Sequence, residues 1–164
     1  SAPQANAFYG CYCALEGDDE AVNTLSSLFS SLGAHLYQIN AENKSQYHAA
    51  AVMASNYLVT LADCAEQLFQ NAGLSHAQSK HMTQTLMSSS LNNMHHAADT
   101  RDSLTGPLAR GDVETISKHL HALKKTSADA FYRAAALATL PITKLTFEKR
   151  QRLNGLFVND DEKD

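Results

Sequence analysis

The chain has 164 residues, of which 44% are apolar and 18% are charged, and its formal net charge is −4. The apolar fraction excludes a disordered polymer, because it is large enough to build a core. With 13 Lys and Arg against 17 Asp and Glu, a nucleic-acid-binding protein is not expected. The longest apolar run, residues 49–54, is far shorter than the roughly 20 residues that cross a bilayer. We therefore expect a cytoplasmic protein without a membrane-spanning segment or a secretory signal.

The first patterned segment, residues 9–39, predicts a βαβ unit. Tyr9–Glu16 is short and aromatic-rich, which is typical of a strand. Gly17 and two aspartates then begin a helix that ends at Gly33, and His35–Ile39 is again strand-like. Strand, helix and strand in this order predict a parallel pair. The helix carries an apolar stripe with 3.6-residue spacing, formed by Ala21, Leu25, Leu28, Phe29 and Leu32.

A parallel sheet of two strands is incomplete by itself. Parallel sheets are normally larger and are covered on both faces. Residues 9–39 therefore predict the last piece of a larger α/β sheet whose earlier strands are absent from this chain. The exposed strand edges should then be covered by a partner chain or a loop.

From residue 42 onward the pattern is helical. Residues 42–71 contain no Gly or Pro and are apolar on most sides, which predicts a central helix wrapped by other helices. Further helices are expected at residues 75–98, 113–123 and 127–140, with an interhelical turn at residues 104–112. We therefore expect a mainly α protein, in which a helical bundle around one long central helix follows a small βαβ piece. The expected parts are a linker with the βαβ piece at 1–40, a helical domain at 41–157 and a disordered tail at 158–164.

Polar side chains on the long helix form a first candidate site. At about 100° per residue, Lys44, His48 and Ser55 lie within about 40° of one another, and Asn56 lies about 80° further round. A basic group, an imidazole, a hydroxyl and an amide on one side of a helix can bind and polarise a carbonyl or hydroxyl substrate. The alternative is a solvated start of the helix, with Ser55 and Asn56 bonded to loop backbone. The spacing alone favours this alternative.

The segment LTGPLARGD at residues 104–112 is a second candidate. Its Gly and Pro residues specify a turn, and Asp112 is a suitable N-cap for the helix that follows. Turn geometry does not require Arg110, whose guanidinium would suit a carboxylate, a phosphate or an ion pair between subunits. An exposed arginine in a loop explains the residue equally well.

The histidines and cysteines do not form a metal motif. His95 and His96 are adjacent, and His119 and His121 are two residues apart, so neither pair shares a helix face. Zinc needs three or four convergent ligands, and the sequence contains no HExxH and no paired CxxC. We therefore expect no metal.

Two motifs carry a resemblance to a known family: YHAAAVMASNY at residues 47–57 and LTGPLARGD at residues 104–112. Together with the order of strand, helix, Leu-Gly-Ala, strand and His before them, they resemble the C-terminal region of uncharacterised Rossmann-like NADP-dependent oxidoreductases. That region is a domain-of-unknown-function family, related to the 6-phosphogluconate dehydrogenase C-terminal-like superfamily. The resemblance covers nearly the whole chain. It implies an upstream Rossmann domain that binds NADP, followed by a helical domain that binds a small-molecule substrate and forms a homodimer.

The resemblance also implies roles for the candidate residues. The long helix would begin beside the nicotinamide, so that His48 and Asn56 would be catalytic and Ser55 would bind substrate. Thr105 and Arg110 would bind substrate in the same cleft or form part of the dimer contact.

One departure from the relatives bears on catalysis. Relatives of the 6-phosphogluconate type place a catalytic Lys one or two turns before an Asn on this helix. Here Val52 or Ala49 stands near that place, and His48 is the nearest titratable side chain. The transfer of the lysine's role to His48 is therefore a hypothesis.

Two functions from different classes remain open. The first is the substrate-binding and dimerisation domain of an NADP-dependent oxidoreductase acting on a small oxo, hydroxy or imino compound. The fragment itself would be inactive, because the cofactor fingerprint is absent from the chain. The alternative is a helical interaction module without chemistry. A pocket lined by His48, Asn56 and Arg110 would favour the first, and an apolar seam with those residues scattered would favour the second.

Overall fold

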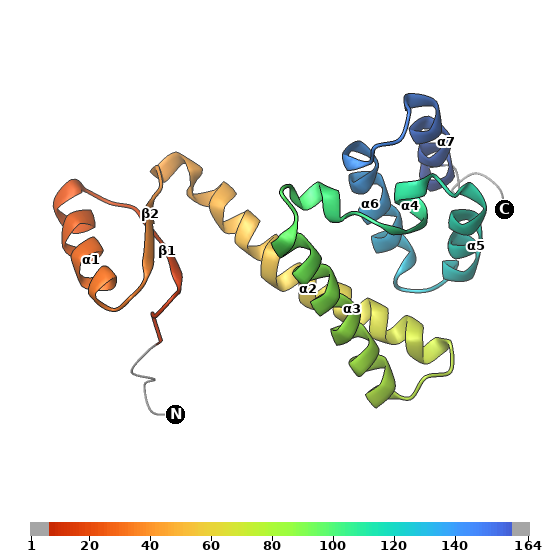
Figure 1. Ribbon diagram of the computed structural model, residues 1–164, viewed down its shortest axis with the longest axis horizontal. Coiled ribbons are helices and arrows are strands. Elements are labelled where there is room, and N and C mark those ends of the chain that lie inside the picture. The colour runs from red at the N-terminus through yellow and green to blue at the C-terminus, as the bar shows by residue number, and fades with distance from the viewer. Residues whose placement is uncertain (1–6, 159–164) are drawn as a thin grey trace. The chain divides into compact units, whose positions relative to one another are not determined.

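The computed structural model describes residues 7–158, which are mainly helical and begin with a two-stranded parallel sheet (Figure 1). The expected mainly α class with a βαβ piece at its start is thereby confirmed. The strands and helices are β1 (Tyr12–Leu15), α1 (Asp19–Ser31), β2 (His35–Gln38), α2 (Lys44–Asn71), α3 (His76–His96), α4 (Gly106–Arg110), α5 (Val113–Leu123), α6 (Asp129–Thr139) and α7 (Phe147–Val158). Short 3-10 helices lie at Ala41–Asn43, Thr100–Ser103 and Leu140–Ile142.

The chain divides into two compact units, residues 1–59 and 60–164. The boundary falls inside α2, which continues without a break from Lys44 to Asn71, and so differs from the expected division at residue 40. The first unit holds the sheet, α1 and the first half of α2. The expected tail lies outside the described residues apart from Val158, which is the last residue of α7.

Local signals determine where the helix of the βαβ piece begins and where it ends. The Asp18 carboxylate accepts the backbone N–H of Ala21 at 2.9 Å and caps the start of α1. At the other end, the N–H of Gly33 donates to the carbonyl of Ser30, and Gly33 adopts a φ of 81°. A Cβ atom at Gly33 would lie only 2.6 Å from the ring of Tyr9, so glycine is required here for space as well as for conformation.

Only part of the apolar stripe of α1 is covered by the described part of the chain. Val22 is buried and Phe29 is half-buried, whereas Leu25, Leu28 and Leu32 are exposed. A sheet of two strands is narrower than the apolar arc of α1, so it covers only the side on which Val22 lies.

One face of the sheet is also bare in the described part of the chain. β1 and β2 pair in parallel with Tyr12 opposite His35, and the side chains of Tyr12, His35 and Tyr37 share this face. The ring of Tyr12 stacks on both His35 and Tyr37, with centroid distances of 4.9 and 5.8 Å. All three side chains are exposed, whereas Leu15, on the opposite face, is buried.

The long helix α2 buries none of its residues against the described part of the chain. The expectation of a helix wrapped by others is therefore not met within residues 7–158. No residue from Ser45 to Ala62 is an Asp, Glu, Lys or Arg, so the helix is as apolar as the sequence indicated. An apolar pattern shows that a helix surface needs to be buried, but not whether residues of the same chain bury it.

The core of the second unit is formed by α5, α6 and α7 and the turn after α6. The buried cluster comprises Ile116, Leu120, Ala136, Leu140, Leu153 and Phe157. The helix α7 was not expected from the sequence, because its Lys and Arg residues obscure the apolar pair Leu153 and Phe157 one turn apart. Arg133 of α6 donates from Nη1 to the backbone carbonyls of Leu156 and Phe157, which satisfies the C-terminal end of α7.

Candidate functional site

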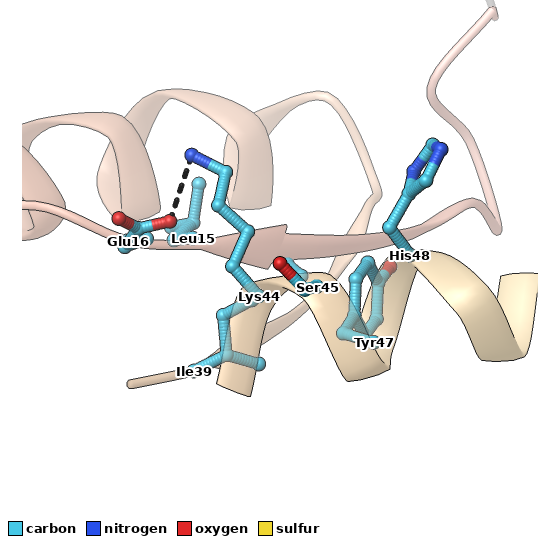
Figure 2. Close-up of a pocket in the computed structure, with 8 residues that line it drawn as sticks. Leu15, Glu16, Ile39, Lys44, Ser45, Tyr47 and His48 are labelled. Carbon is cyan, nitrogen blue, oxygen red and sulfur yellow. Dashed lines mark ion pairs between the residues drawn. The ribbon is translucent and has the colours of Figure 1, made fainter. Parts of the chain in front are cut away.

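A cavity of about 600 Å³ lies at the carboxyl ends of β1 and β2 and the first turns of α2 (Figure 2). It is lined by Ala14, Leu15, Glu16, Ile39, Lys44, Ser45, Tyr47 and His48. Its volume suits a small molecule. In α/β proteins, ligands bind outside the carboxyl ends of parallel strands. This cavity, which lies entirely within the first unit, is therefore the candidate site.

An ion pair closes one side of the cavity. Lys44 Nζ lies 2.9 Å from Glu16 Oε2, and Figure 2 shows the two side chains pointing toward each other. Glu16 follows the last residue of β1, and Lys44 is the first residue of α2. The pair therefore joins the carboxyl end of the sheet to the start of the long helix. As an exposed pair it contributes little stability by itself, so its position matters more than its energy.

His48 lies one helical turn after Lys44 and lines the same cavity. The spacing of these two residues in the sequence predicted that they share a side of the helix, and the structure agrees. Ser45 and Tyr47 also line the cavity but were not singled out in the sequence. Glu16 was missed as well, although its place directly after a strand was a usable signal.

Ser55 and Asn56 do not line this cavity. They lie about 11 Å further along the helix axis than His48, at a rise of about 1.5 Å per residue. Ser55 Oγ donates to the carbonyl of Ala51 at 2.6 Å and contacts Asn56 Oδ1 at 2.9 Å. The idea that Ser55 bonds to loop backbone is therefore wrong, because its partners lie on its own helix.

Thr105 and Arg110 belong to the second unit and lie at the two ends of α4. The expected interhelical turn at residues 104–112 thus contains a short helix, with Pro107 in its first turn. The side chain of Thr105 makes no capping hydrogen bond, and the side chain of Arg110 is exposed. Gly111 ends α4 with a φ of 73°, a conformation that favours glycine. The substrate-binding roles of Thr105 and Arg110 stay predictions.

Asp112 caps the start of α5, as its sequence position predicted. Its carboxylate accepts the backbone N–H of Thr115 at 3.1 Å and the hydroxyl of the same residue at 2.7 Å. These two hydrogen bonds hold the pKa of Asp112 below its ordinary value, the backbone N–H having the larger effect. Capping of α5 is therefore sufficient to explain an aspartate at position 112.

Within residues 7–158, no group of three or more His, Cys, Asp and Glu side chains is placed to hold a metal ion. The three cysteines are free thiols. Among the described helices, none combines the length and the apolar composition that crossing a bilayer requires.

Comparison with known proteins places the chain in a family. The profile described as "Domain of unknown function (DUF2520)" matches residues 11–139. The chain belongs to this family. The DUF2520 match includes both the cavity of the first unit and the segment 104–112, so the predicted membership of a domain-of-unknown-function family is confirmed.

Among solved structures, the chain is similar to the crystal structure of protein TM1727 from Thermotoga maritima, with a TM-score of 0.70 and 26% sequence identity. The similarity covers 80% of this chain and 52% of the Thermotoga protein, so the DUF2520 chain spans about half the length of that relative. No curated protein matches the chain.

Proposed function

We propose that the chain is the substrate-binding and dimerisation domain of an NADP-dependent oxidoreductase that acts on a small oxo, hydroxy or imino compound. The observation that carries the proposal is the position of His48 on a cavity at the carboxyl ends of two parallel strands. Imidazole has the intrinsic pKa that suits proton transfer near neutral pH. In this proposal NADP, bound by an upstream Rossmann domain, supplies or takes the hydride. His48 gives or takes the proton at the substrate oxygen or nitrogen.

The bare sheet supports an upstream nucleotide-binding domain. The stacked face of Tyr12, His35 and Tyr37 is exposed, and within residues 7–158 the sheet has only two strands. Parallel sheets are normally covered on both faces and contain more strands. Further strands and helices of a larger sheet would cover these surfaces. The greater length of the Thermotoga protein is consistent with such an additional part.

The remaining predicted site residues enter the proposal with narrower roles. Asn56 would act beside His48 in catalysis, and Ser55, Thr105 and Arg110 would bind substrate. The chain has no Gly-rich phosphate-binding fingerprint, so the residues that hold NADP would belong to the upstream domain.

The test of the oxidoreductase proposal is a cofactor titration of the whole protein, expressed from its complete reading frame. We expect saturable quenching or enhancement of NADPH fluorescence by the whole protein, and none by residues 1–164 alone. A complete reading frame that adds no nucleotide-binding domain, or a whole protein that binds neither NADPH nor NADH, would overturn the proposal.

The first half of α2 supports the dimerisation part of the proposal. On a helical wheel, Tyr47, Met53, Tyr57 and Leu58 lie within an arc of about 140°, together with Ala50, Ala54 and the polar Gln46. The four larger side chains are all exposed. Lys44, His48 and Ser55 lie outside this arc. One side of the helix is thus mostly apolar, and Lys44 and His48 of the candidate site lie outside it. Tyr47 stands at the border, because it also lines the cavity.

We assign the apolar side of α2 to a second copy of the chain. This side has no charged residue, so two copies meet there without the like-charge contacts that the net charge of −4 would otherwise cause. Two-fold pairing buries the same surface on both partners. The same observation favours the alternative function, a helical interaction module without chemistry, and the cofactor titration separates the two functions.

Substitution of Tyr57 by glutamate tests this dimer contact. We expect Tyr57→Glu to convert a dimer to a monomer in sedimentation equilibrium, because it places a charge on each side of an apolar contact. The matched control is Val59→Glu, since Val59 is 70% exposed and lies on the other side of the helix. A wild-type mass of one chain at high protein concentration, or equal effects of both variants, would contradict the assignment.

A further inference from the structure

We propose that Lys44 binds a carboxylate group of the substrate, so that the site takes a small oxo, hydroxy or imino acid. The reaction rests on the proposed function, whereas the binding of a carboxylate rests on the cavity and its charges.

The distribution of charge singles out Lys44. It is the only Lys or Arg among residues 1–59, which contain five acidic residues: Glu16, Asp18, Asp19, Glu20 and Glu42. The other 12 Lys and Arg and the other 12 Asp and Glu lie in residues 60–164. The first unit therefore carries the whole net charge of −4, and its one lysine lines the cavity. In so acidic a unit, this ammonium group is the one Lys or Arg side chain to which an anion can bind.

The ion pair with Glu16 positions the ammonium group without enclosing it. The side chain of Glu16 is 27% exposed and that of Lys44 is 68% exposed, so the ammonium is the outer partner. An ammonium group has three N–H donors, and the contact with Glu16 Oε2 at 2.9 Å occupies one of them. Lys44 can therefore donate to a ligand carboxylate while Glu16 holds it at the cavity wall.

A carboxylate fits this site better than a phosphate. A phosphate monoester carries about 1.5 to 2 negative charges near pH 7 and is usually met by several donors or cations. The first unit offers a single lysine among five acidic side chains. Because Glu16 already pairs with this lysine, the single charge of a carboxylate meets less repulsion here than the roughly two charges of a phosphate.

Lys44 and His48 line the same cavity one helical turn apart, so one small acid could contact both residues. Residues four apart on a helix have Cβ atoms about 6 Å apart. A carboxylate on Lys44 places the neighbouring carbonyl carbon toward His48. In the reduction, NADP held by the upstream domain would supply the hydride that adds to this carbon. The C=O π bond would break, and the imidazolium of His48 would give its proton to the oxygen. The product is the hydroxy acid, and neutral His48 takes the proton back in the oxidation.

The test is a titration of the 164-residue chain followed by backbone amide NMR. The probes are pyruvate and lactate, each compared with its neutral amide, pyruvamide or lactamide, at constant ionic strength. We expect saturable shifts at Glu16 and at residues 44–48 with the two acids and not with the amides. In Lys44→Met the affinity should fall about tenfold or more, a loss of about 1.4 kcal/mol. Lys44→Arg should retain binding.

The matched control is Lys80→Met, which removes an exposed lysine of α3 that does not line the cavity. It should bind pyruvate like the wild type. Equal shifts with acids and amides, unchanged affinity in Lys44→Met, or no saturable shift with either acid would overturn the proposal. Because the titration contains no cofactor, its failure is distinguishable from failure of the NADPH experiment on the whole protein.

Discussion

Replacement of His48 by alanine in the whole protein should lower the rate of hydride transfer by about 10²–10⁴-fold, the usual contribution of general acid–base catalysis. His48 is the titratable imidazole on the cavity at the carboxyl ends of β1 and β2. Without it, only solvent or the other side chains that line the cavity can give a proton to the substrate oxygen. The rate is measured in a single turnover from the absorbance of NADPH, mixed with an excess of an oxo acid.

The pH profile distinguishes a catalytic role of His48 from a structural one. The wild-type rate of reduction should be lower at alkaline than at acidic pH, because an imidazolium is the acid, and His48→Ala should lose this dependence. The control is His76→Ala, which removes an exposed histidine at the start of α3. An unchanged rate in His48→Ala would contradict the assignment of proton transfer to this residue.

Replacement of Phe157 by alanine should destabilise the second unit by about 3–5 kcal/mol, the usual cost of truncating a buried phenylalanine. Phe157 is only 5% exposed and packs in the cluster with Ile116 and Leu153. Truncation leaves a cavity among α5, α6 and α7 that these helices cannot fill without losing other contacts. The free energy is measured by denaturant unfolding, with hydrogen exchange of the α5–α7 amides to assign the loss to this unit.

The same helix provides the control for this prediction. Phe147, the first residue of α7, is 65% exposed, so Phe147→Ala removes the same side chain with little loss of burial. We expect it to cost less than about 1 kcal/mol. Equal effects of the two variants would show that α7 does not contribute to the core as the structure describes.

Local signals made most of the helix boundaries predictable. Asp18, Ser75 and Asp112 each cap a helix through a hydrogen bond to a backbone N–H no more than three residues away. Gly33 ends α1 for a similarly local reason. Such interactions depend on a few consecutive residues, which is why they can be identified from the sequence without knowledge of the fold.

Patterns that depend on partners elsewhere in the chain were less informative. The helix α7 was missed because its buried pair, Leu153 and Phe157, follows a charged first half and indicates a helix only when α5 and α6 provide a surface for it. Three leucines of the α1 stripe are exposed, because the width of the sheet determines how much of an apolar arc is covered. The hydrophobic effect is not directional. An apolar pattern therefore identifies which residues need to be buried, but not which residues they pack against.

The candidate site, too, could be predicted from the sequence only in part. By itself, the sequence determined the mainly α class, the βαβ order and the helical spacing that puts Lys44 and His48 on one side of α2. Only the tertiary structure brought Glu16 beside Lys44 across the carboxyl end of the sheet, and only it separated Ser55 and Asn56 from the cavity. The physical reason is that helical periodicity specifies an angle around one helix, whereas a site also requires a position along the helix axis and neighbours from distant parts of the chain.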